Sequence, residues 1–260
     1  MIPERVPHRI VVFSGKGGVG KTTVAVNLAY LLARRKMEVG LLDADVTGPN
    51  VLQMMGVRDA PRQGASGLIP HEREGVKAVS LASLLPPDAA VIWRGPMRSK
   101  AIEQLLDETD WGALDVLVVD LPPGTGDEAL TIAQKVSPQL ALVVTTPQEV
   151  ALMDARRAIG FARKLEIPSI GIIENMSGFA CPSCGTKIDL FGIDGGREEA
   201  EKQSVLFLGA VPIDPATRTS GDEGRPIVLE EPSGAVAQAF DEIASAVGRA
   251  MGFGPSDAGT

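Results

Sequence analysis

The sequence predicts an α/β protein with a doubly wound, mostly parallel sheet and helices on both faces of that sheet. Apolar, β-branched runs alternate along the chain with longer amphipathic runs, which is the pattern of strand–helix–strand units. Most of the strand-like runs are apolar throughout, as in DVLVVDL and QLALVVTT, and this is typical of strands covered on both faces. A glycine-rich loop follows the first strand, at the sheet edge where such folds bind ligands.

The expected elements follow one another in regular order. Strands are expected at residues 9–13, 38–43, 76–81, 115–120, 139–145, 169–174 and 206–210. Helices are expected at residues 22–35, 97–109, 127–135, 149–164, 196–203 and 234–251. Residues 58–75 are polar and rich in glycine, so we expect a surface loop there.

Size and composition favour one domain. The chain has 260 residues, 44% of them hydrophobic, and no apolar run is long enough to span a membrane. Because no linker or internal repeat divides the chain, we expect a single domain over residues 1–252 and a disordered tail over 253–260.

Charge and cysteine content exclude several function classes. The 33 acidic and 25 basic residues give a net charge of −8, which disfavours general binding of nucleic acid or of a membrane surface. The first residues, MIPERVPHR, lack the apolar core of a signal peptide, and two cysteines give no disulfide framework. We therefore expect a protein of the reducing cytoplasm.

The stretch GKGGVGKTT (residues 15–23) carries the chemistry of a phosphate-binding loop. It fits G-x-x-x-x-G-K-[ST] between the strand HRIVVF and a helix with an apolar stripe at Val24, Leu28, Leu31 and Leu32. Its backbone N–H groups would bind the phosphates of ATP, Lys21 would reach the β- and γ-phosphates, and the Thr22 hydroxyl would ligate Mg²⁺. We expect the whole loop to bind nucleotide, through Gly15, Lys16, Gly17, Gly18, Val19, Gly20, Lys21, Thr22 and Thr23.

Two acidic segments are expected at the same edge of the sheet. Asp43 and Asp45 follow the second strand, where an aspartate could orient the attacking water or hold Mg²⁺. Asp120 ends the run DVLVVD, as a Walker B aspartate does, and would meet Mg²⁺ directly or through water. The mechanism we expect has Asp45 orient or activate water, with Asp43 in support.

The second lysine of the loop, Lys16, points to a dimer. Lys21 already serves the phosphates, so Lys16 could project toward the nucleotide of a second subunit, as an arginine finger does. The loop resembles those of the deviant Walker A ATPases, which read KGGxGK[ST] and include MinD, ParA and the nitrogenase iron protein. In that family the early lysine crosses a face-to-face dimer, and the resemblance implies the same catalytic role for Lys16.

Cys181 and Cys184 form a C-x-x-C in a glycine-flanked loop. Two thiolates do not complete a tetrahedral site, and His8 and His71 lie far away in the sequence. Two chains would together supply four thiolates, which suits a [4Fe–4S] cluster or zinc. A redox pair and a chance pair of structural cysteines remain as alternatives.

Longer stretches resemble the Mrp (ApbC, Nbp-type) iron–sulfur cluster carriers over roughly residues 9–250. They are GKGGVGKTT, LLDADVTGPN, AAVIWRGPMRSKAI, DVLVVDLPPGTGDE, VVTTPQEVAL, ENMSGFACPSCG and VPIDP. The resemblance implies an ATPase homodimer that binds a [4Fe–4S] cluster between its subunits and passes it to apoproteins. It also implies that Asn175 reads adenine and that Pro212 lines the adenine site. Many members have an extra N-terminal domain, so we expect this chain to be a minimal carrier.

Two other functions stay open. A switch of the MinD or ParA kind would bind membrane or DNA, yet the last expected helix, with apolar residues at Val236, Phe240, Ile243 and Val247, has Arg249 as its only base. An ATPase in which zinc at the cysteines only holds the dimer together is also compatible with four thiolates.

Overall fold

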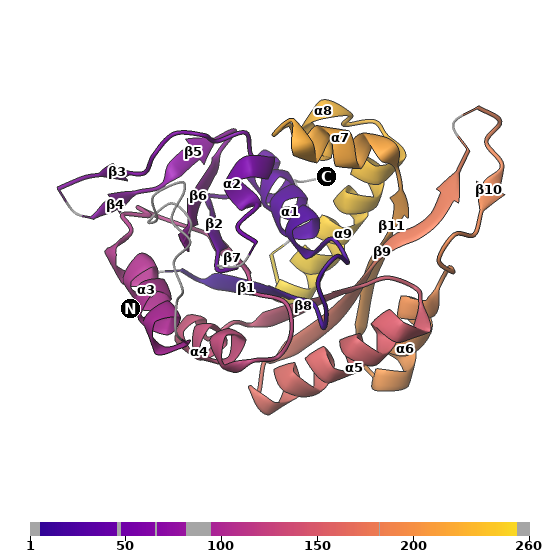
Figure 1. Ribbon diagram of the computed structural model, residues 1–260, viewed down its shortest axis with the longest axis horizontal. Helices are drawn as coiled ribbons and strands as arrows, with labels where there is room; N and C mark the ends of the chain where they lie inside the picture. Colours follow the sequence, from indigo (N-terminus) through magenta and orange to yellow (C-terminus); the bar gives the residue numbers. More distant parts are fainter. Residues whose placement is uncertain (1–5, 46–47, 66, 82–94, 182, 254–260) are drawn as a thin grey trace, which may run out of the picture.

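A single large sheet with helices on both faces organises the described part of the chain (Figure 1). The computed structural model describes residues 6–45, 48–65, 67–81, 95–181 and 183–253. Within these ranges the sheet has nine strands, in the order β10-β9-β8-β1-β7-β2-β6-β5, and β11 also pairs with β9. Only the pairs β5–β6 and β10–β9 are antiparallel there, so the expected mostly parallel α/β fold is confirmed.

Seven strands of the main sheet lie where strands were expected, and the other two, β5 and β10, were not expected. They are β1 (His8–Phe13), β2 (Val39–Asp43), β5 (His71–Arg73), β6 (Val76–Ser80), β7 (Val116–Asp120), β8 (Leu140–Thr145), β9 (Ser169–Ala180), β10 (Lys187–Ile188) and β11 (Leu206–Ile213). A separate pair is formed by β3 (Arg62–Gln63) and β4 (Leu68–Ile69).

The helices form two layers (Figure 1). One layer contains α1 (Lys21–Arg34), α2 (Val51–Met54), α7 (Pro215–Asp222), α8 (Ile227–Glu230) and α9 (Ala235–Met251). The other contains α3 (Gly95–Glu108), α4 (Asp127–Val136), α5 (Glu149–Lys164) and α6 (Gly195–Gln203).

Strand β1 shows why the sheet must be covered twice. Its side chains alternate between the two faces. Ile10 and Val12 join the core beneath α1 and α9, whereas Val11 and Phe13 join the core beneath α4 and α5. Phe13 packs edge-on against Phe161 of α5, with ring centroids 5.7 Å apart. Both faces of this continuously apolar strand are therefore buried.

The prediction for the C-terminal helix is confirmed in its packing. α9 lies on β11 and α1, and its apolar stripe is buried, with Phe240 and Ile243 fully enclosed. The stripe is thus part of the core. A membrane-binding helix would instead present such a stripe at the surface.

Two expectations on local structure were wrong, and several short helices were not expected. The loop expected over residues 58–75 contains β3, β4 and β5, because β5 turns back and pairs antiparallel with β6. Strand β9 does not end at 174 but continues to Ala180 and forms a hairpin with β10. Helix α7 was not expected, although Asp214 caps it and Pro215 opens it.

Some sequence expectations lie outside the described residues. One is the disordered tail, of which residues 254–260 are not described. The other is the family-like stretch 89–102, whose first part lies in the undescribed residues 82–94. The single domain over residues 1–252 stays a prediction.

Candidate nucleotide-binding site

The phosphate-binding loop lies between β1 and α1 and has the backbone that its glycines permit. Gly18 and Gly20 adopt φ angles of 82° and 86°, the left-handed region that other residues rarely enter. Gly15 approaches the backbone of Asp154 in α5 so closely that a side chain there would overlap it. The N-terminus of α1 follows directly, so its free N–H groups point toward the loop, as an anion site requires.

Lys21, Thr22 and Asp120 meet at the C-terminal end of β7. The Lys21 Nζ lies 2.7 Å from Asp120 Oδ1, and the Thr22 hydroxyl donates to Asp120 Oδ2 at 2.6 Å. Asp120 is fully buried, and burial raises the pKa of its carboxyl while the Lys21 ammonium opposes that rise. The hydroxyl and carboxylate oxygens form a hard donor set that suits Mg²⁺. Thr22 and Asp120 would hold the ion beside the phosphates.

The second pair of aspartates divides into one buried and one cleft residue. Asp43 accepts hydrogen bonds from the backbone N–H groups of Asp45 (3.1 Å) and Val51 (3.3 Å) and from the Ser80 hydroxyl (3.1 Å). Burial, and next the charge of Asp120, raise the pKa of Asp43 to about 8. Asp45 lines the cleft, and its Oδ2 lies 3.9 Å from Lys21 Nζ. Asp45 is therefore placed to act on a ligand, and Asp43 to support its backbone.

A cleft of about 1010 Å³ opens over the loop. Among its walls are Gly17, Gly18, Gly20, Lys21, Thr22, Thr23, Asp45, Asn175 and Pro212 from the predicted set. Gly15 and Val19 lie behind this surface, where Val19 is 3% exposed and its carbonyl accepts the Asn175 side-chain amide at 2.8 Å. Lys16 is half-buried and does not line the described cleft of the single chain.

Part of the cleft wall was missed in the sequence. Met176, Leu190 and Phe191 line it from the segment around the hairpin, and Thr217 and Arg218 line it from α7. The Asp214–Pro215 pair, which caps and opens α7, was the available signal for the second group. The first group had no local signal, because Leu190 and Phe191 reach the cleft only through the fold.

The cysteines occupy the tip of the β9–β10 hairpin, which projects from one side of the molecule (Figure 1). The Cys181 N–H donates to Thr186 O at 2.9 Å, and the Gly185 N–H donates to Cys181 O at 2.8 Å. Cys184 is exposed, and its hydrogen bonds with Thr186, followed by one with Cys181, lower the pKa of its thiol. A lowered pKa favours the thiolate, which is the form that binds metal.

Cys181 and Cys184 supply two thiols, whereas a tetrahedral metal site has four ligands. Nowhere in the described residues do three or more His, Cys, Asp or Glu side chains gather as ligands of a metal ion would.

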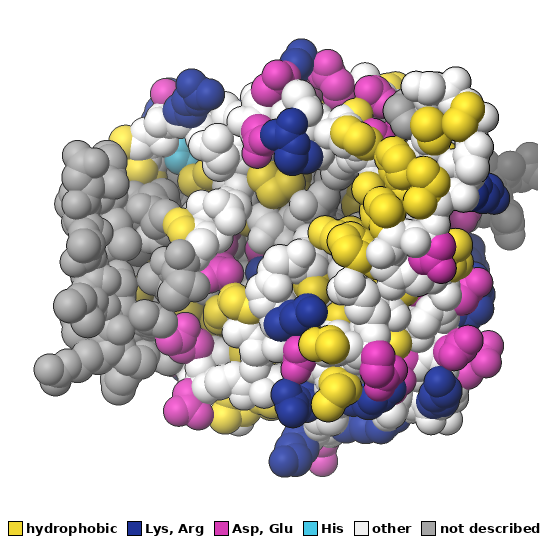
Figure 2. Space-filling view, turned by 45° about the vertical axis from the view of Figure 1, so that its right-hand side comes forward, with side chains coloured by type: hydrophobic (Ala, Val, Ile, Leu, Met, Phe, Trp, Pro, Cys, Tyr) yellow, Lys and Arg dark blue, Asp and Glu magenta, His cyan; other side chains and the backbone are white. Residues whose placement is uncertain are grey.

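An apolar patch adjoins the hairpin. We define it by six exposed side chains, on the first turns of α5 and on the segment from β10 to α6: Val150, Met153, Ile188, Leu190, Phe191 and Ile193. The two segments touch, because Gly192 packs against Pro147 just before α5. Figure 2 shows hydrophobic side chains gathered on the side of the molecule that carries the hairpin. Contiguous exposed apolar side chains are typical of interaction surfaces.

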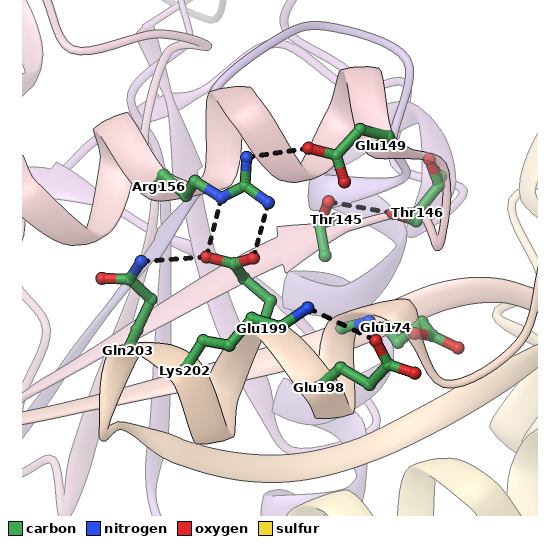
Figure 3. Close-up of polar contacts among 10 residues, drawn as sticks. Thr145, Thr146, Glu149, Arg156, Glu174, Glu198, Glu199, Lys202 and Gln203 are labelled. Atoms are coloured by element: carbon green, nitrogen blue, oxygen red, sulfur yellow. Dashed lines mark hydrogen bonds and ion pairs between the residues drawn. The ribbon is translucent and has the colours of Figure 1, made fainter.

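An ion pair between a buried glutamate and a partly exposed arginine joins the two helices beside this patch (Figure 3). Arg156 of α5 donates two hydrogen bonds to Glu199 of α6, at 2.9 and 2.8 Å, and a third to Glu149. The Arg156 hydrogen bond is the main reason that the pKa of Glu199 is lowered. Gln203 also donates to Glu199 at 3.0 Å, so every oxygen of this buried carboxylate is occupied.

Comparison with known proteins identifies the family. The model of the ParA family described as "NUBPL iron-transfer P-loop NTPase" matches residues 5–248. The chain belongs to this family of iron-transfer P-loop NTPases. The resemblance that the sequence motifs indicated is therefore confirmed.

Several relatives support the assignment. The iron–sulfur cluster carrier protein of Pyrococcus horikoshii is 47% identical, over 91% of this chain and 84% of its own length. That of Methanocaldococcus jannaschii is 50% identical, over 87% of this chain and 79% of its own. The iron–sulfur cluster transfer protein NUBPL of Dictyostelium discoideum is 43% identical, over 94% of this chain and 76% of its own.

Solved structures are similar to this P-loop NTPase in fold. A nucleotide-binding protein in complex with ADP from Archaeoglobus fulgidus has a TM-score of 0.79 and 37% identity, covering 92% of this chain and 95% of its own. The cell division ATPase MinD of Pyrococcus furiosus has a TM-score of 0.68 and 25% identity, covering 94% of this chain and 99% of its own.

In the part of the chain that the structure describes, the helices are too short or too polar to cross a membrane.

Proposed function

We propose that this P-loop NTPase binds and hydrolyses ATP and carries a [4Fe–4S] cluster, held between two subunits, to apoproteins. The observation that carries the proposal is the hairpin: its tip presents two free thiols, and the segments at its base form a wall of the nucleotide cleft. One module thus joins a metal-binding end to a nucleotide-binding end. The relatives named as iron–sulfur cluster carriers support the cargo.

In the nucleotide half of the proposal, five side chains in and behind the cleft bind the phosphates, Mg²⁺ and the attacking water. Lys21 binds the β- and γ-phosphates in place of its pairing with Asp120, and Thr22 and Asp120 hold Mg²⁺. Mg²⁺ would supply charge neutralisation at the phosphates. Asp45 orients the attacking water, and the buried Asp43 fixes the Asp45 backbone through its hydrogen bond.

The adenine end of the cleft is assigned to Asn175 and Pro212. The Asn175 amide offers both a donor and an acceptor, which adenine's edge requires. In this structure it donates to Val19 O, so it already bridges β9 and the phosphate-binding loop. Pro212 lines the same cleft as Asn175.

A homodimer completes both sites. Two thiols per chain give four from two chains, the ligand number of a [4Fe–4S] cluster. Lys16 lines no part of its own cleft, which suits a lysine that acts on the partner's nucleotide. The apolar patch lies beside the hairpin and would be covered by the second subunit.

The reducing cytoplasm is the setting we propose, because both cysteines are free and a cluster needs thiolates. Acceptors of the cluster would be apoproteins with their own vacant thiolates. Nucleic acid and membrane are not partners in this proposal, in line with the net charge of −8.

A transfer assay tests the function. The chain, reconstituted anaerobically with iron and sulfide, is mixed with an apoprotein whose activity needs a [4Fe–4S] cluster, in the presence of a chelator that traps free iron. We expect activation by the wild-type chain and none by Cys181→Ala or Cys184→Ala. Equal activation by the cysteine variants would refute the carrier function, and a zinc-loaded chain without transfer would favour the zinc-stapled ATPase.

A further inference from the structure

One buried carboxylate closes the base of the cysteine-bearing segment. Glu174 is fully buried in β9. The chain runs from residue 175 out to the cysteines and comes back into contact with Glu174 at residue 194. Its oxygens accept the backbone N–H of Asp194 at 3.0 Å, the backbone N–H of Gly196, and the hydroxyl of Ser177. We call residues 175–193 the cysteine excursion. Figure 3 shows Glu174 beside the first turn of α6.

The two ends of the cysteine excursion are also walls of the nucleotide cleft. At its start, Asn175 donates to Val19 O of the phosphate-binding loop, and Met176 lines the cleft. Near its end, Leu190 and Phe191 line the same cleft. Glu174 thus lies between Asn175, which a nucleotide would touch, and Asp194, where the chain returns from the cysteines.

Glu174 is held strongly enough to transmit a movement. A buried carboxylate without partners is costly, and here three donors satisfy it at the positive end of α6. The fit is close as well, because a methyl group on Gly196 would lie 3.0 Å from Glu174 Oε2. A shift of β9 at this point must therefore carry Asp194 and Gly196 with it.

We infer that Glu174 is a positioning residue that couples the nucleotide cleft to the cysteines. When a nucleotide engages Asn175, the adjacent Glu174 moves both ends of the cysteine excursion as one unit. This changes the surroundings of Cys181 and Cys184 at the tip. The inference rests on the proposed nucleotide site, and a ligand can bias the hairpin only if its contacts differ between two arrangements.

The test measures thiol alkylation in the full chain without a cluster. Iodoacetamide reacts with Cys184, and its rate is followed by mass spectrometry with and without Mg-ADP. In the wild type we expect Mg-ADP to change the rate by about fivefold, the lower end of coupling between two protein sites. In Glu174→Gln the rates with and without Mg-ADP become equal, because the Gln amide can accept only one of the two backbone N–H bonds. The affinity for ADP, measured by calorimetry, changes by less than about twofold.

Glu199→Gln is the matched control, since Glu199 is a second buried glutamate, on α6, and it accepts hydrogen bonds from Arg156 and Gln203, both outside the cysteine excursion. It keeps the fivefold effect. Should Glu174→Gln fail to fold, Ser177→Ala removes one donor to the same carboxylate and gives an intermediate ratio. A wild-type rate indifferent to Mg-ADP, or a nucleotide effect that survives in Glu174→Gln or is unaltered in Ser177→Ala, overturns the inference.

The outcome is separable from that of the proposed function. Cluster loading is measured on the wild type by iron and sulfide content, which alkylation does not use. A chain that loads no cluster yet shows the Glu174-dependent nucleotide effect would refute the carrier and leave the coupling intact. A chain that loads and transfers a cluster without that effect would do the reverse.

Discussion

Replacing Gly20 by alanine should destabilise the chain through two separate effects. Gly20 lies at φ 86° and ψ 26°, and a left-handed conformation costs an L-residue about 1–2 kcal/mol. The added methyl group would also overlap the Asn175 amide nitrogen. Asn175 must then move and lose its hydrogen bond to Val19 O, which is worth about 1 kcal/mol. The free energy of unfolding should fall by about 2–3 kcal/mol in total.

Gly18 supplies the matched control. It has nearly the same φ, 82°, but a methyl group there would meet nothing within 4 Å. Gly18→Ala should therefore show the conformational cost alone, about 1–2 kcal/mol. Urea denaturation of the nucleotide-free chain, followed by far-UV circular dichroism, measures both variants.

A double-mutant cycle with Asn175→Ala isolates the overlap. Once the Asn175 amide is gone, Gly20→Ala has nothing to displace, so the two changes should be non-additive by about 1 kcal/mol. Gly20→Ala should weaken ADP binding as well. Equal losses in Gly18→Ala and Gly20→Ala, or an additive cycle, would refute the reasoning from this contact.

Three further predictions concern charged side chains. The pKa of Asp43 is raised from 3.8 to about 8 in the folded chain, so between these pH values the folded chain keeps a proton that the unfolded chain releases. The free energy of unfolding without nucleotide should therefore fall as pH rises between those values. Asp43→Asn should flatten this slope in urea titrations. Lys16→Ala should reduce ATP turnover by about 10³-fold while leaving nucleotide affinity nearly unchanged, as removal of a finger residue does. Arg156→Met should lower the urea midpoint, because Glu199 stays 1% exposed without its cation.

Each of these has a control on an exposed residue. Asp107→Asn should leave the pH slope as it is, and a slope unchanged in Asp43→Asn as well would contradict the assignment of the proton. Lys164→Ala should keep full turnover, and turnover retained in Lys16→Ala would exclude a catalytic lysine in trans. Arg157→Met, on the same helix as Arg156, should be nearly neutral because the Arg157 side chain is 70% exposed where it pairs with Asp154.

The sequence predicted the elements of the sheet because their pattern is local. The runs that became β1, β7 and β8 are apolar throughout, and that signal needs no tertiary information. The phosphate-binding loop was equally readable, since a glycine-rich loop between strand and helix has few other uses. The convergence of Thr22 and Asp120 follows from the parallel pairing of β1 with β7.

What could not be predicted depends on contacts between distant residues. Strand β9 extends to Ala180 because β10 and β11 both pair with it, and neither partner lies within the local pattern. Leu190 and Phe191 became cleft residues, and Glu174 became the closing point of the cysteine excursion, only through the return of the chain from the hairpin. The sequence predicted different roles for Asp43 and Asp45, and those roles stay a prediction, whereas the burial of Asp43 beside Asp120 follows from the pairing of β2 with β7.

The central claim is that two chains share one cluster, and metal analysis of the reconstituted dimer tests it most directly. The chain is loaded anaerobically with iron and sulfide, isolated by size exclusion with its mass measured, and analysed for iron, sulfide and zinc. We predict a dimer with about four irons and four sulfides, lost in both Cys181→Ala and Cys184→Ala, as a site of four thiolates requires. A monomer that holds the whole cluster, or a dimer that holds zinc without sulfide, would contradict the account.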